Sequence, residues 1–239
     1  MIRRKFAITL LSALVWLAIV SSPVSAEWFA DLFVGPAFTQ SDDVVLKFPG
    51  LTIRLKDVDF DTSASFGGRL GHWFESAPYL GFALDVSHFR PQIGRQTVTD
   101  CVTGSVPPCF SLPLLHLNLA VTGISFDALL RWPLLTSKEF PKGQLQPYLT
   151  IGPTIFVARI KDSSNLFPPN DSDTDTSVGV KAGAGMAWQF HRNVALFGEY
   201  RFTHFRPEFT LRDAFLGNSR TKTDIDTHGV VFGVSFRFY

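Results

Sequence analysis

The sequence predicts an all-β fold, an eight-stranded antiparallel β-barrel that spans a membrane, and three observations lead to this fold class. First, apolar residues recur at every second position through the last third of the chain, as in Val178, Val180 and Ala182, and the residues between them are small or polar. A period of two is that of a β-strand. Second, the polar row is rich in glycine and charge, which fits a narrow polar interior with lipid outside. Third, the connections alternate between short and long, as in membrane barrels.

Eight segments carry this alternation. They are residues 28–38, 65–74, 79–89, 116–132, 147–160, 176–190, 194–205 and 227–239. The connections after the second, fourth and sixth segments are the shorter ones, at residues 75–78, 133–146 and 191–193. The other four are longer polar loops, at residues 39–61, 90–114, 161–175 and 206–226. Because membrane barrels keep short turns on the periplasmic side, we expect both termini in the periplasm and the four loops outside.

Residues 1–26 are expected to be a cleavable secretory signal peptide. Three basic residues at positions 3–5 precede an apolar core that is short for a membrane-spanning helix, and small residues end at Ala26. Cleavage before Glu27 leaves a single barrel domain, residues 27–239, and an uncleaved anchor is the alternative. The cleaved chain has a slightly negative formal charge, so it offers no basic face for nucleic acid.

The chain has two cysteines, Cys101 and Cys109, both in the second long loop. An exported protein meets an oxidising compartment, so we expect a disulfide bond that staples this loop. The alternative, a redox-active pair, is disfavoured because the spacing is not Cys-x-x-Cys and no basic residue flanks the pair.

The inward rows of the predicted strands carry charges of both signs, which must pair because a lone buried charge is costly. They are Asp31, Arg69, Asp85, Asp127, Lys181, Glu199, Arg201 and Arg237. A barrel of eight strands has room only for side chains, so we interpret this set as a salt-bridged plug that holds the barrel shut. A polar conduit or proton relay is the alternative.

Tryptophan and tyrosine gather at the strand ends that carry the short turns, where a ring with one polar atom suits the headgroup level of a bilayer. This predicted periplasmic girdle consists of Trp28, Trp73, Tyr79, Trp132, Tyr148 and Trp188. A less regular girdle is expected at the opposite ends. It consists of Phe38, Phe89, Phe156 and Phe205 with His88, His204 and His228.

No catalytic, metal-binding or cofactor-binding residue is predicted. The six histidines lack ligand spacing of the His-Glu-x-x-His type. Ser87 and His88 are adjacent, so they point to opposite faces of a strand and do not form a nucleophile–base pair. The glycines between Gly179 and Gly185 lack the Gly-Lys-Ser/Thr ending of a phosphate loop, and small inward residues account for them.

Three segments of the chain have a characteristic sequence: EYRFTHF at residues 199–205, QPYL at 146–149 and SFRF at 235–238. In these segments the chain resembles the small outer-membrane β-barrels of Gram-negative bacteria, the OmpA-like and opacity-protein-like barrels of the porin family. The resemblance extends over residues 27–239 and implies Sec-dependent export to the outer membrane, contact with lipid and lipopolysaccharide, and insertion by the barrel-assembly machinery. That machinery is expected to read the last strand, at Phe232, Val234, Phe236, Phe238 and Tyr239. Tyr239 stands one residue beyond the lipid-facing row.

The resemblance implies a structural or surface role and no enzymatic activity: envelope integrity, or contact with ligands or a host through the external loops. A narrow channel or carrier for small solutes, as in OmpW-like barrels, is the alternative. A lipid-A-modifying enzyme is a third hypothesis. A soluble lipocalin-like barrel would need an apolar interior, which the charged row argues against.

Overall fold

A computed structural model describes residues 27–40, 42–48, 51–93, 96–102, 109–114, 117–162, 172–213 and 217–239. The expected signal peptide and His116 lie outside these residues. No helix within the described ranges is long and apolar enough to cross a membrane.

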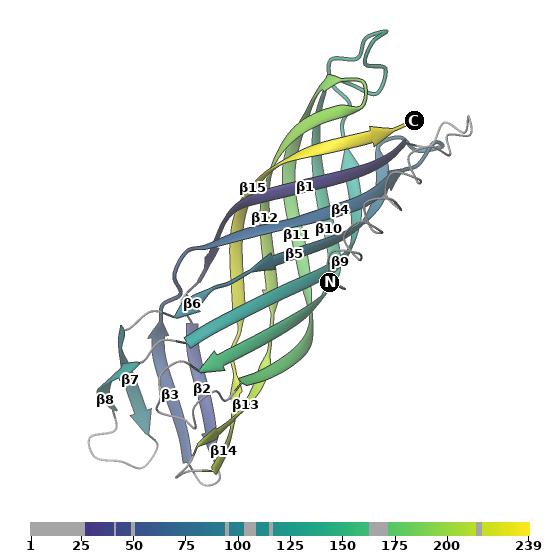
Figure 1. Cartoon of the computed structure of the whole chain (residues 1–239). Coiled ribbons are helices and arrows are strands. Elements are labelled where there is room, and N and C mark those ends of the chain that lie inside the picture. The colour runs from purple at the N-terminus through teal and green to yellow at the C-terminus, as the bar shows by residue number, and fades with distance from the viewer. Residues whose placement is uncertain are drawn as a thin grey trace, which may run out of the picture.

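Eight antiparallel strands close into a barrel (Figure 1). They are β1 (Glu27–Thr39), β4 (Ser63–Trp73), β5 (Leu80–Phe89), β9 (Leu117–Arg131), β10 (Leu145–Asp162), β11 (Ser172–His191), β12 (Val194–Phe205) and β15 (Ile225–Phe238). Each strand pairs with its neighbours in this order, β9 pairs with β10, and the first strand pairs with the last. The predicted eight-stranded fold is therefore confirmed, with strand boundaries that differ from the expected ones by a few residues.

The barrel wall is apolar outside and polar inside. Large hydrophobic side chains are exposed on the outer surface, among them Leu32 at 64%, Phe232 at 62% and Ile151 at 58%. The residues between them point inward and are buried, as Asp31 and Arg69 are. This is the reverse of a soluble barrel, and it is the arrangement that a lipid environment stabilises.

Glycines of the inward rows make room for aromatic rings on neighbouring strands. A Cβ atom at Gly71 would lie 2.3 Å from Cζ of Phe29 and 2.8 Å from the carbonyl oxygen of Phe82. The Phe29 ring in turn stacks on Trp73, with 5.7 Å between the ring centroids. The glycine-rich face thus fits a packed interior, in which small residues on one strand accept large ones from the next.

We expect Gly71→Ala to destabilise the barrel by about 1–3 kcal/mol, because the added methyl group has no space. The free energy of unfolding in urea, followed by tryptophan fluorescence in detergent micelles, measures this change. Because the closest contact is the Phe29 ring, Phe29→Leu should restore part of the loss. A Gly71→Ala variant as stable as the parent would contradict this packing.

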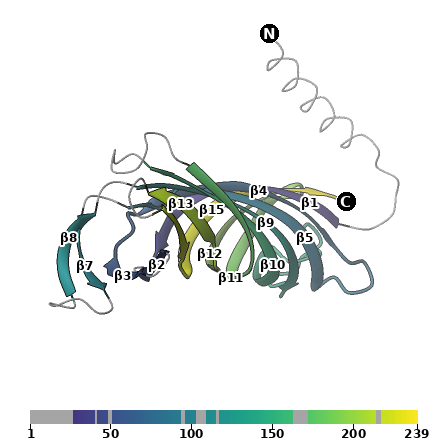
Figure 2. The ribbon, with the colours of Figure 1, turned by 90° about the horizontal axis from the view of Figure 1, so that it is seen from below.

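The long connections form a second sheet instead of the polar loops expected from the sequence. Its six strands are antiparallel, in the order β13-β14-β2-β3-β7-β8. They are β2 (Asp42–Phe48), β3 (Leu51–Val58), β7 (Gln96–Val102), β8 (Cys109–Leu114), β13 (Glu208–Asp213) and β14 (Gly217–Lys222). We call this the external sheet. It lies beyond the end of the barrel opposite to the C-terminus, and β7 and β8 lie furthest from the barrel (Figures 1 and 2).

The third long connection is shorter than expected, because β10 continues to Asp162 and β11 starts at Ser172. The short strand β6 (Gln92–Ile93) pairs with the start of β9. Two carboxylates near the start of β11 meet the backbone of β13: Asp175 accepts a hydrogen bond from the amide of Glu208, and Asp173 accepts one from the amide of Thr210. These bonds join the external sheet to the barrel wall.

Candidate functional site

The interior charges form the candidate site. Ten ionisable side chains with exposures of 5% or less occupy the barrel, five cationic and five anionic among the described residues. They are Arg69, Arg131, Lys181, Arg201 and Arg237 with Glu27, Asp31, Asp85, Asp127 and Glu199. The balance of signs matters because an unpaired ion in a low-dielectric interior costs several kcal/mol.

The central cluster lies midway along the barrel, and Glu199 of β12 is its main acceptor. Arg69 of β4 donates through Nη2 to both Glu199 oxygens, at 2.9 and 2.7 Å. Arg201 donates to Glu199 Oε1 at 2.5 Å, and the Tyr148 hydroxyl donates to Oε2 at 2.7 Å. Side chains from three strands, β4, β10 and β12, thus meet on one carboxylate, which ties separate parts of the barrel wall together.

Asp85 of β5 is the second acceptor of the central cluster. Its Oδ2 atom lies 3.2 Å from Nε of Arg69, 3.2 Å from Nη2 of Arg201 and 3.1 Å from Nζ of Lys181. Lys181 also contacts Asp127 Oδ2 at 2.6 Å, and Arg69 lies 3.6 Å from Asp31. Seven of the eight charges singled out from the sequence therefore belong to one connected network.

The eighth predicted charge, Arg237, belongs to a separate cluster at the end of the barrel that holds the termini. We call it the terminal cluster. Glu27 accepts hydrogen bonds from Arg131 and Arg237, one on each carboxylate oxygen, both at 2.6 Å. The amide oxygen of Gln146 accepts from the same two arginines, at 3.3 and 2.8 Å. Lys142, in the turn between β9 and β10, approaches Glu27 at 3.6 Å.

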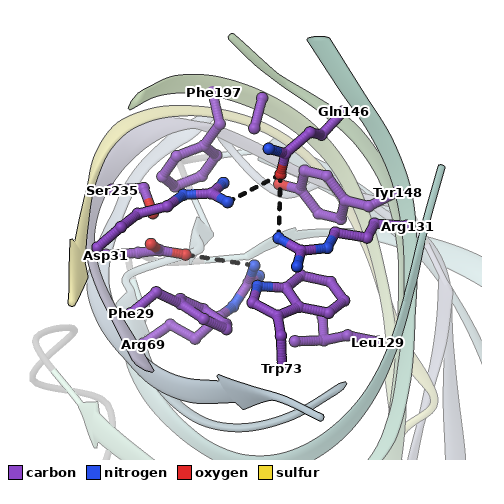
Figure 3. Close-up of a pocket in the computed structure, with 12 residues that line it drawn as sticks. Phe29, Asp31, Arg69, Trp73, Leu129, Arg131, Gln146, Tyr148, Phe197 and Ser235 are labelled. Atoms are coloured by element: carbon purple, nitrogen blue, oxygen red, sulfur yellow. Dashed lines mark hydrogen bonds and ion pairs between the residues drawn. The ribbon is translucent and has the colours of Figure 1, made fainter. Parts of the chain in front are cut away.

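The two clusters face each other across a layer of rings. The Arg131 guanidinium lies over the Trp73 ring at 4.1 Å, and the Arg201 guanidinium lies over the Phe33 ring at 3.8 Å. A cavity of about 20 Å³ remains between the clusters, which is room for roughly one water molecule. Figure 3 shows side chains from all round the wall converging on this space. The interior is therefore filled by protein side chains.

An apolar cluster fills the barrel at the end towards the external sheet. Phe156 and Phe205 stack there with 4.1 Å between their centroids, and both are 1% exposed. The less regular girdle expected at the strand ends opposite the short turns is therefore wrong for Phe89, Phe156 and Phe205, which point inward. Phe38 is exposed on the outside. The cluster contains Ala37, Phe89, Leu119, Val121, Phe156, Ala158, Ile160, Phe205, Phe209 and Ile225.

Of the six rings in the girdle predicted near the termini, four point outward and two point into the barrel. Trp28, Tyr79, Trp132 and Trp188 are 46–51% exposed on the outer surface. Trp73 and Tyr148 are inside, at 6% and 7%. Strand parity is the reason: Trp73 is in the same row as Arg69, and Tyr148 is in the same row as Thr150. Applied to every aromatic residue, the alternation would have found both.

Sequence reasoning left Glu27 and Arg131 out of the charge network. Arg131 lies on the inward row of β9 with Asp127, so its parity was an available signal. Glu27 stands at the expected cleavage site, and no strand pattern precedes it. The same cluster includes Tyr239, whose hydroxyl accepts a hydrogen bond from Gln189 at 2.9 Å. Burial and the nearby Glu27 carboxylate raise the pKa of Tyr239 above its usual value.

The other predicted residues have simpler surroundings. Phe232, Phe236 and Phe238 are exposed on the outside of β15, and Val234 is half-buried. Cys101 and Cys109 face each other directly in the pairing of β7 with β8. Directly opposed residues have the Cα separation that a disulfide needs. The disulfide stays a prediction, which mass spectrometry before and after reduction would test.

No group of three or more histidine, cysteine, aspartate or glutamate side chains suited to a metal ion occurs in the part of the chain that the structure describes. His88 does not contact Ser87: its Nδ1 atom lies 3.0 Å from the Thr122 hydroxyl, and Arg90 donates to its Nε2 at 3.2 Å. His204 pairs with Asp226 at 2.6 Å on the outer wall.

The chain is similar to several solved structures at low sequence identity. The outer membrane protein OprG of Pseudomonas aeruginosa is 12% identical with a TM-score of 0.52, and the match covers 89% of this chain and 96% of that one. The outer membrane protease OmpT of Escherichia coli is 8% identical with a TM-score of 0.51, covering 92% and 99%. Neisserial surface protein A is 14% identical with a TM-score of 0.48, covering 91% and 100%. No curated protein sequence matches the chain.

These likenesses concern the fold alone, and because one of the three proteins is a protease, the fold leaves enzymatic activity open. The family comparison is more informative. Residues 12–238 match the family described as the outer membrane protein beta-barrel domain, which is nearly the whole chain. An apolar outer wall, a polar interior and short periplasmic turns are general features of outer-membrane β-barrels. The chain belongs to the outer membrane protein β-barrel family, and its place is the bacterial outer membrane.

Proposed function

We propose that the protein is a non-conducting, non-enzymatic outer-membrane scaffold that presents the external sheet at the cell surface, where the sheet contacts ligands or a host. The observation that carries this proposal is the external sheet itself, six strands contributed by three separate connections. A rigid barrel that holds such a sheet away from the membrane supports a binding role better than a transport role, since function on a scaffold resides in its connecting segments.

The filled interior supports the same proposal. The charges neutralise each other in pairs, and the apolar cluster closes the end beneath the external sheet. A channel would need a continuous water-filled path, whereas the cavity between the clusters has room for roughly one water. The narrow channel remains the alternative, and conductance separates the two.

We expect the purified protein to show no steady conductance in planar bilayers. Arg201→Leu should lower the temperature at which the folded barrel unfolds, because it removes the partner of Glu199 and Asp85, and it should not open a pore. Single-channel recording and heat-dependent gel mobility measure the two effects. A large rise in conductance for Arg201→Leu would contradict the plug and favour the conduit.

The surface role is tested on cells that display the protein. Replacing residues 96–114, the β7–β8 hairpin, with a short turn should keep the heat-dependent gel mobility of the barrel and reduce adhesion of the cells to host-cell monolayers or matrix proteins. Replacing residues 75–77 in a turn at the other end is the matched control, which should leave adhesion unchanged. Adhesion equal to that of cells without the protein, for parent and variants alike, would rule out this contact.

The remaining partners are proposed on the same basis. The exposed aromatic row of β15 supports recognition by the barrel-assembly machinery, and the apolar wall supports contact with outer-membrane lipid. Mass spectrometry of lipid A from a deletion strain would test the competing hypothesis of a lipid-modifying enzyme. A changed lipid A would contradict the non-enzymatic role.

A further inference from the structure

The outer wall carries a cationic strip just above its apolar belt. On β10, the outward row reads Ile151 and Ile155, both exposed apolar residues, and then Arg159 and Lys161, both exposed. β10 ends near the external sheet (Figure 1), so its two cations, which stand in its last four residues, lie towards that end of the barrel. In an outer-membrane barrel, this height is the headgroup level of the outer leaflet.

The strand beside β10 adds hydroxyl groups at the same height. Thr174 of β11 is paired with Arg159, and Ser172 is paired with Lys161. Both residues are exposed, as the two cations are. Directly opposed side chains in a sheet lie about 5 Å apart, so each cation has a hydroxyl group beside it. The four side chains form a patch that offers positive charge and hydroxyl hydrogen-bond donors and faces the membrane.

The charge of this patch is uncompensated within the described residues, where neither Arg159 nor Lys161 has an ion pair. The strands on the other side of β11 differ. There, His204 of β12 is hydrogen-bonded to Asp226 of β15, and Arg206 pairs with Asp224. Two free cations at the edge of an apolar belt therefore fit an anion supplied by the membrane, and the anion of a bacterial lipid headgroup is phosphate.

We propose that Arg159, Lys161, Ser172 and Thr174 form a binding site for the phosphate groups of lipopolysaccharide in the outer leaflet. The guanidinium of Arg159 suits two phosphate oxygens at once, and Lys161 adds a second charge. Ser172 and Thr174 donate through their hydroxyl groups to the remaining oxygens. The acyl chains of the same lipid would lie against Ile155 and Ile151 below. The proposal depends on the outward face being the lipid face and does not depend on what the external sheet contacts.

The test compares two charge-matched variants of the full-length exported protein, purified in a zwitterionic detergent. Arg159→Gln with Lys161→Gln removes the site. Lys138→Gln with Arg192→Gln removes two exposed cations at the opposite end of the barrel. Heat-dependent gel mobility shows that each variant is folded. Binding of fluorescent lipopolysaccharide, and of the same lipid after enzymatic removal of its phosphates, is measured at low and high salt.

We expect the parent and the Lys138/Arg192 variant to bind the phosphorylated lipid equally. The Arg159/Lys161 variant should bind it more weakly by about fivefold for each cation removed, or about 25-fold for the pair. The dephosphorylated lipid should bind all three proteins weakly, and high salt should reduce the difference between them. Exchanging the two cations, Arg159→Lys with Lys161→Arg, should retain most of the affinity, which a purely structural role for either residue would not predict.

Three results would overturn the proposal. One is equal affinity of the Arg159/Lys161 variant and the parent for phosphorylated lipid. Another is an equal loss in both charge-matched variants, which would indicate net charge alone. The third is full displacement of the lipid by inorganic phosphate, which would make free phosphate the ligand.

Discussion

Replacing Glu199 with glutamine is expected to destabilise the barrel more than any other single change of charge, by about 3–5 kcal/mol in the free energy of unfolding. Both carboxylate oxygens accept two hydrogen bonds each, from Arg69 and Arg201 on one oxygen and from Arg69 and Tyr148 on the other. A glutamine amide has one oxygen only. In either orientation of the amide, its NH₂ group points at hydrogen-bond donors of Arg69 and of Arg201 or Tyr148. Both buried arginines also lose the carboxylate that lies closest to them.

Urea unfolding in detergent micelles and the temperature of the gel-mobility shift measure this effect. Glu75→Gln is the control, because the same chemical change occurs there in an exposed turn and should shift stability by less than about 0.5 kcal/mol. Tyr148→Phe adds a second check. Its cost should be smaller in the Glu199→Gln background than in the parent, since the two side chains share a hydrogen bond. Equal stability of Glu199→Gln and the parent would show that the central cluster does not hold the walls together.

Replacing Glu27 with glutamine is expected to have the second-largest effect, about 2–4 kcal/mol. Each oxygen of Glu27 accepts from a different arginine, Arg131 of β9 and Arg237 of β15, and the side chain is fully buried. An amide in this place again puts donors against one of the two arginines. Glu27 links the first strand to β9 and to the last strand. The loss of stability should therefore be greatest where the first strand pairs with the last and closes the barrel.

The matched control for this variant is Glu139→Gln, an exposed glutamate in the turn at the same end of the barrel. We expect the unfolding midpoint of Glu139→Gln to match that of the parent and the midpoint of Glu27→Gln to fall. N-terminal sequencing of the exported variants should be done in parallel, because Glu27 also adjoins the expected cleavage site. If both glutamate variants lose stability equally, the terminal cluster has no special role in closing the barrel.

The external sheet was predictable in part. Residues 51–55 alternate between apolar and polar side chains, and residues 44–48 are apolar except for Lys47. The two segments flank Pro49-Gly50, which is a hairpin signal. The connections that hold these segments are polar overall and lie outside the eight strands that a small barrel needs, so the sequence predicts loops there. What the sequence could not show is that hairpins from three connections pair with one another, since β14 meets β2 and β3 meets β7 across long separations.

By itself, the sequence determined the fold class, the eight barrel strands and the inward direction of the eight charges. These follow from a period of two, which is a local property of each strand. Only the tertiary structure decided which charges meet, such as Arg69 with Glu199, 130 residues apart. It also joined Glu27 to the two arginines and set Arg159 beside Thr174. Contacts across a barrel depend on the register of every strand pair and on closure of the first strand against the last, and no local pattern contains that information.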